Sequence, residues 1–220
     1  MTLSILTFDR KTGVFAAAAA TGSLCVGGWV LRGDIESGLV ASQGTAPSTF
    51  WRDDILRAMY GGTSASDAVA KVTDADDGRA FRQVAALDRN GTTAAFTGQN
   101  SIPHADHMAE PGQVISGNML AGPEVLDAMA DAARDTRDRP AERMLRILNA
   151  AKFAGGDSRG LQSAALLVLT PDAPPLDLRI DCSEDPLGAL ATLLQKAQQP
   201  PYHDWLSEVP VISDKTRRPA

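Results

Sequence analysis

The feature that most constrains the fold is a run of five consecutive alanines, Ala16 to Ala20, preceded by Val14 and Phe15. Alanine forms strands poorly, so the run alone is also compatible with a helix. An exposed helix this short would be unstable in water. Small side chains instead suit a strand buried on both faces, with other elements packed closely over it. The run therefore favours a central strand of a covered sheet.

The residues before this run complete a hairpin. Leu3, Ile5, Leu6 and Phe8 form an apolar segment, and the polar break 9–13 after it contains a glycine. Two short apolar segments around such a loop predict a β-hairpin over residues 2–22. Thr2 then stands at the start of the first strand.

At that position Thr2 could take part in a chemical reaction. Methionine aminopeptidases remove Met1 when the next residue is small, and the chain would then begin with a threonine. A free α-amine beside a β-hydroxyl combines a base and a nucleophile, and an amine pKa of roughly 7.7–8.0 suits work near neutrality. The alternative reading is that Thr2 merely follows a start codon, as in many proteins.

Length, composition and net charge limit which classes of protein this chain can belong to. With 220 residues and 44% hydrophobic residues, one domain is expected, over 1–199, followed by a proline-containing tail over 200–220. The net charge of −6 and the lack of a basic cluster argue against nucleic acid. We expect no membrane span, no secretion signal, no cofactor and no metal, and a cytoplasmic protein with reduced Cys25 and Cys182.

Apolar periodicity and turn residues predict the remaining elements, which are strands at 29–31, 38–43, 81–87, 92–97, 113–116, 162–169 and 176–181, and helices at 51–60, 67–72, 123–134, 140–153 and 186–197. Residues 32–34 are expected to be a turn, 101–111 a loop, and Ser66 an N-cap. Hairpin-joined strands at both ends of the chain favour an α+β fold with antiparallel sheets covered by helices.

A glycine-rich loop at 155–160 carries candidate binding residues. Its backbone could approach a ligand closely. Arg159 could grip a carboxylate, and Asp157 could hold that arginine or an amine. Gln162 and Ser163 follow at the start of a strand. The alternative is a plain turn in which Asp157 and Arg159 pair with each other.

Other polar residues at strand ends are weaker candidates. Gly117 and Asn118 end a strand before a helix, where an amide and backbone N–H groups could form an oxyanion hole, or Asn118 could simply be a turn residue. Ser23 and Gln43 could line a pocket or be ordinary polar ends. His104 and His107 lack further metal ligands, so surface histidines or one ligand-contacting histidine are the two readings.

Several segments together resemble the DUF1028 family: TLSILTFD at residue 2, AAAAATGS at 16, FTG at 96, His107, GNMLAGPEVLDAM at 117, GGDSRGLQSAALLV at 155 and LDLRIDCSEDP at 176. That family resembles the N-terminal nucleophile hydrolases. The resemblance implies a four-layer αββα sandwich of two antiparallel sheets, with Thr2 as the nucleophile. Ala46, the stretch 48–52 and His104 depart from the family pattern, which puts the pocket wall and the substrate in question.

We expect an amidohydrolase acting on a small-molecule amide, carboxylate-bearing if Arg159 binds it. Asn118 would hold the oxyanion, and His107, Gln43, Asp157 and Arg159 would orient the substrate. Two rivals stay open: a non-catalytic module that binds a small anion, and a structural subunit of an assembly, with a homo-oligomer among the expectations. A hydrolase using Ser4 or Cys25 is a weaker alternative.

Overall fold

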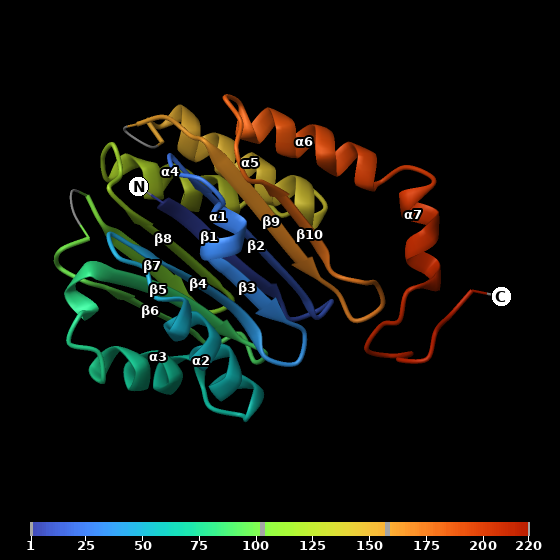
Figure 1. Ribbon diagram of the computed structural model, residues 1–220, viewed down its shortest axis with the longest axis horizontal. Helices are drawn as coiled ribbons and strands as arrows, with labels where there is room; N and C mark the ends of the chain where they lie inside the picture. The colour runs from blue at the N-terminus through green and yellow to red at the C-terminus, as the bar shows by residue number, and fades with distance from the viewer. Residues whose placement is uncertain (1, 102–103, 157–158, 220) are drawn as a thin grey trace.

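A computed structural model describes residues 2–101, 104–156 and 159–219. Its strands form two antiparallel sheets, seen in Figure 1. The six strands of the large sheet are, in spatial order, β10 (Leu176–Ile180), β9 (Ser163–Leu169), β2 (Val14–Thr21), β1 (Thr2–Asp9), β8 (Gln113–Asn118) and β7 (Asp106–Glu110). The four strands of the small sheet are β3 (Leu31–Asp34), β4 (Gly38–Gly44), β5 (Arg82–Asp88) and β6 (Thr93–Thr97).

Helices cover the outer face of each sheet (Figure 1). Those on the large sheet are α4 (Glu124–Ala133), α5 (Pro140–Phe153) and α6 (Pro186–Ala197). Those on the small sheet are α2 (Thr49–Tyr60) and α3 (Ala65–Asp74). The short segments are α1 (Val26–Trp29), α7 (Tyr202–Trp205) and the 3-10 turns η1 (Arg79–Phe81) and η2 (Leu206–Glu208). The predicted α+β class with two antiparallel sheets is confirmed.

The alanine strand lies in the middle of the large sheet, between β1 and β9. Ala16, Ala18 and Ala20 belong to the core under the helices. Ala17 and Ala19 belong to the core between the sheets. All five are almost completely buried, which agrees with a strand covered on both faces. The predicted hairpin is also confirmed, with Thr2 opposite Thr21 at its open end.

Several local expectations were wrong. The expected strand at 29–31 and the turn at 32–34 are in fact α1 followed by β3, because two glycines let the chain make one helical turn before the strand. Residues 106–110, expected to be loop, form the edge strand β7. Ser64, not Ser66, caps α3 by accepting from the Asp67 N–H.

The C-terminal residues do not hang free as a tail. The chain turns through α7 and η2, and Val211 becomes buried. Val211 and Ile212 share a cavity with residues after β3 and β9, among them Ile35 and Pro174. The last segment therefore packs on the chain's own surface, at the end of the sheets opposite the start of β1 (Figure 1).

Candidate functional site

The layer between the sheets is apolar along most of its length and polar at one end. Leu6 of β1 and Leu39 of β4 lie in its apolar part. Because alternate residues of a strand share a face, Thr2 and Gln43, each four residues away, point into the same layer. The polar end is thus a continuation of the two inner sheet faces.

Two rows of polar residues meet there. In the large sheet, Thr2 pairs with Thr21 on one side and with Asn118 on the other. In the small sheet, Gln43 pairs with Gln83, and Gln83 pairs with Thr97. Strand register alone therefore brings residues 2, 21, 43, 83, 97 and 118 to one end of the inter-sheet layer.

A cavity of about 550 Å³ opens over this end. Its described lining residues are Thr2, Thr21, Ser23, Leu24, Val26, Trp29, Val30, Gln43, Gly44, Thr45, Pro47, Asn118, Met119 and Arg159. The Thr2 and Thr21 hydroxyl oxygens lie 3.2 Å apart. Arg159 is the one charged side chain among these lining residues, so the cavity favours an anionic or polar neutral ligand.

Below Thr2, three amide side chains form a buried hydrogen-bond network. Gln43 Nε2 donates to Gln83 Oε1 at 2.7 Å and to the Thr2 carbonyl oxygen at 3.3 Å. Asn118 Nδ2 donates to the same Gln83 oxygen at 3.1 Å. Gln83 Nε2 in turn donates to Gly117 O, Asp106 O and Thr97 Oγ1. The network ties the first residue of β1 to both sheets.

The family model of DUF1028, described as a family of unknown function, matches residues 2–190. The chain belongs to this family. It is 49% identical to a solved DUF1028 protein, SPO2555 from Silicibacter pomeroyi, with a TM-score of 0.94, covering 100% of this chain and 99% of that one. No curated protein of known function matches the chain.

Two further solved structures are more distant from this DUF1028 chain. Eukaryotic HslV from Trypanosoma brucei is 12% identical, with a TM-score of 0.46, over 77% of this chain and 99% of that one. Thiobacillus denitrificans BPH in complex with epoxomicin is 16% identical, with a TM-score of 0.41, over 83% of this chain and 100% of that one. Similarity at this level carries no argument about function.

The cavity of the DUF1028 chain brings together five of the residues singled out from sequence: Thr2, Ser23, Gln43, Asn118 and Arg159. Asp157 lies outside the described residues.

The other candidates do not line the cavity. His107 Nδ1 lies 2.9 Å from Thr97 Oγ1, which accepts a hydrogen bond from Gln83 Nε2. His107 is therefore linked to the amide network through Thr97. Gly117 contributes its carbonyl oxygen to Gln83. Gln162 N–H donates to Thr21 O, and Ser163 Oγ donates to Ser23 O and accepts from Val26 N–H. These last residues hold the cavity wall in place.

Gln83 is the residue that sequence reasoning missed. It is completely buried at the centre of the network. A glutamine at the start of an apolar strand looks like an ordinary polar end. The available signal was that both Gln43 and Gln83 are polar residues near the end of an otherwise apolar strand.

Arginines fix the cavity wall that α1 provides. The buried Arg52 guanidinium donates to Gly28 O and Trp29 O, both at 2.9 Å. Arg32 Nη1 donates to Gly27 O at 3.3 Å and Leu31 O at 2.9 Å. Burial lowers the pKa of Arg32, and the nearby charge of Arg52 lowers it further. Carbonyls at the end of this single helical turn, which would otherwise lack donors, are thereby satisfied.

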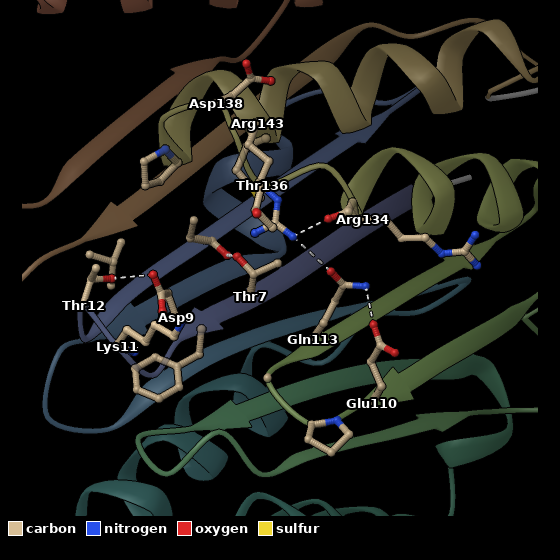
Figure 2. Close-up of a pocket in the computed structure, with 18 residues that line it drawn as sticks. Thr7, Asp9, Lys11, Thr12, Glu110, Gln113, Arg134, Thr136, Asp138 and Arg143 are labelled. Carbon is tan, nitrogen blue, oxygen red and sulfur yellow. Dashed lines mark hydrogen bonds between the residues drawn. The ribbon is translucent and has the colours of Figure 1, made fainter.

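A second cavity, of about 660 Å³, lies at the other end of β1 (Figure 2). Arg143 extends into it and donates to Ala133 O, near the end of α4, and to Gln113. Asp9 accepts from the Lys11 N–H, which lowers the pKa of the Asp9 carboxyl. Thr7 lines this cavity and stands five residues from Thr2, roughly 17 Å along a strand. The two cavities are therefore separate, and Arg143 acts mainly as a helix C-cap.

Proposed function

We propose that the DUF1028 chain is an N-terminal-nucleophile amidohydrolase that cleaves the C–N amide bond of a small molecule, with Thr2 as nucleophile after Met1 removal. The observation that carries the proposal is that Thr2, the first residue of the central strand β1, lines a cavity of about 550 Å³. The α+β fold with two antiparallel sheets also agrees with the fold class that the family resemblance implies.

In this mechanism, the Thr2 hydroxyl oxygen attacks the carbonyl carbon of the amide. The α-amine takes the hydroxyl proton and passes it to the leaving nitrogen as the C–N bond breaks. The acyl group then forms an ester with Thr2. Water hydrolyses this ester, and its proton returns to the hydroxyl by way of the amine.

The remaining lining residues bind and orient the substrate. Asn118 and neighbouring N–H groups stabilise the oxyanion of the tetrahedral intermediate. Arg159 attracts a carboxylate of the substrate. Trp29, half exposed at the cavity wall, offers an apolar surface for the rest of the molecule. The favoured substrate class is therefore a small amide that carries both a carboxylate and an apolar group.

The decisive experiment tests whether Thr2 must carry a free α-amine. A peptide fused before Thr2 keeps the hydroxyl but converts the α-amine into an amide, which cannot act as a base at neutral pH. We expect no release of ammonia or amine from a panel of carboxylate-bearing amides by the fused protein. Activity should appear after a protease cuts directly before Thr2.

The controls separate this effect from folding and tagging. A C-terminal tag of the same length should leave activity unchanged. Thr2→Ala, cut in the same way, should be inactive with an unchanged melting temperature. Full activity of the uncut fusion protein would refute the proposal.

A further inference from the structure

Two buried oxygen atoms near Thr2 accept no hydrogen bond from the described residues. They are Gln43 Oε1 and Asn118 Oδ1, and both side chains are only 1% exposed. Leaving a buried acceptor unsatisfied costs about 1–3 kcal/mol. Both atoms belong to amides that donate to the same Gln83 oxygen, so one donor group beside these amides could serve both.

The orientation of these amides follows from the atoms around them. Gly117 O and Asp106 O can only accept, so the Gln83 group facing them must be its NH₂. Gln83 Oε1 then faces Gln43 and Asn118, which must both present their NH₂ groups to it. Exchanging oxygen and nitrogen in either amide would set two oxygens against each other. The two unsatisfied oxygens are therefore turned away from Gln83.

The nitrogen of Thr2 is a neighbouring group that can change its number of donors. Thr2 is paired directly with Asn118 across the strands, and its carbonyl oxygen accepts from Gln43. Within a peptide bond this nitrogen has one N–H donor. As a free amine it has two, and as an ammonium three. Loss of Met1 thus supplies the donors that two oxygens lack.

We propose that Gln43 Oε1 and Asn118 Oδ1 accept hydrogen bonds from the free α-amine of Thr2, and that Gln83 is the positioning residue that turns both oxygens toward it. The inference rests on the proposed function only in requiring that Thr2 begins the chain. Two N–H bonds to fixed oxygens would leave the lone pair of the neutral amine in a defined direction, available for the hydroxyl proton.

Arg159 and His107 are charged or titratable residues of the described chain that bear on this site. Arg159 is the charged residue among the described lining residues of the cavity. In the described part of the chain, His107 reaches the network through Thr97 and Gln83. Changes in the amine's pKa caused by replacing an amide can therefore be measured with these two groups left in place.

The test measures the pKa of the Thr2 amine directly, without a substrate. Each protein is released from a fusion by a protease that cuts before Thr2, so every chain begins with threonine. Acetic anhydride labels the amine over a range of pH, and mass spectrometry of the N-terminal peptide reports the rate. Gln43→Met removes one acceptor with little change in size. Gln83→Met leaves both acceptors in the protein but frees them to turn.

Both variants should lower the pKa of the amine by about one unit, a tenfold change in its proton affinity, because the protonated form loses a hydrogen-bond acceptor. Ser4→Ala is the matched control: Ser4 is buried on the same strand, and its Oγ bonds Ser116 Oγ at 2.9 Å instead of a side-chain amide. It should leave the pKa unchanged. Circular dichroism checks that each variant is folded.

An amine pKa that is the same in the native protein, Gln43→Met and Gln83→Met would overturn the inference. A shift of equal size in Ser4→Ala would also overturn it, because the loss of any buried polar group would then lower the pKa of the amine. If the native protein hydrolyses no amide but the two variants shift the pKa, the proposed function fails while the inference stands.

Discussion

At the scale of single residues, the cavity has a floor of buried amide side chains and a side that is open to solvent. Gln43, Gln83 and Asn118 are buried and held by hydrogen bonds to both sheets. Arg159, in the glycine-rich loop, is exposed and lines the cavity. We therefore expect substitutions on the floor to change chemistry and substitutions at Arg159 to change recognition.

Replacing Arg159 tests that division. In Arg159→Ala, KM for a carboxylate-bearing amide should rise about tenfold, whereas kcat should change little, because a carboxylate contact made equally in the ground and transition states affects binding only. Steady-state kinetics on the substrate and on its uncharged ester or amide analogue give the measurement. The analogue should show no difference between native and variant proteins.

The control for this experiment is Arg57→Ala, which removes an exposed arginine from α2 that pairs with Asp54, away from the cavity. Its kinetics should match those of the native protein. A fall in melting temperature of Arg159→Ala with unchanged KM would show instead that the arginine is structural.

At the scale of elements, α1 is the part of the wall that depends most on close packing. A Cβ added at Gly27 would lie 2.6 Å from Arg179 Cγ and 2.9 Å from Ala165 Cβ. A Cβ at Gly28 would meet only the flexible end of Arg179, with Nη2 at 2.9 Å. The two neighbouring glycines therefore tolerate an added side chain to different degrees, although they look alike in the sequence.

We predict that Gly27→Ala lowers the free energy of unfolding by about 1–3 kcal/mol, because α1 must move away from β9. Gly28→Ala is the matched control and should cost less than about 1 kcal/mol, since the Arg179 side chain can shift. Chemical denaturation of both variants provides the comparison. Equal losses in the two would contradict the packing argument.

The elements that sequence predicted well share strong local signals. The helices α5 and α6 were placed correctly because a proline starts each and apolar residues recur on one face. The edge strand β7 was missed because its residues are mostly exposed and show no apolar alternation. The helix α1 was missed because four residues, two of them glycines, are too few to show the apolar periodicity of a helix.

The candidate site was predictable where it lay at strand starts and ends, and unpredictable where it depended on register. Thr2, Gln43 and Asn118 could be named, but nothing local says that residues 2 and 118 pair, or that Gln43 and Gln83 are partners. Those pairings join segments far apart in the chain. They also decide which amide oxygen faces Thr2.

At the scale of the whole molecule, the C-terminal segment packs at the end of the sheets opposite the cavity. Ending the chain after Gln199 removes the burial of Val211 but none of the three cores. We predict that the shortened protein folds cooperatively and loses about 2 kcal/mol of unfolding free energy. Thermal and urea unfolding measure the loss.

Val211→Ala in the full-length chain separates the contribution of that side chain from the rest of the segment. It should account for a large part of the loss. A shortened protein that fails to fold would show that the segment is part of the domain and not an addition to it. Light scattering on both proteins reports whether the segment also affects association.

The alanine strand has a consequence for which mutations the chain can tolerate. Alanine is usually the residue that replaces others in a scan, because it fits almost anywhere. Here Ala17 and Ala19 face one core while Ala18 and Ala20 face another, and every one is completely buried. A single added methyl at Ala17 or Ala19 would press the two sheets apart, and the contact between Gln43 and Thr2 spans that gap. The least reactive side chains of the molecule therefore act as a spacer for its candidate chemistry, and genetic variation should be rarest where the sequence looks most ordinary.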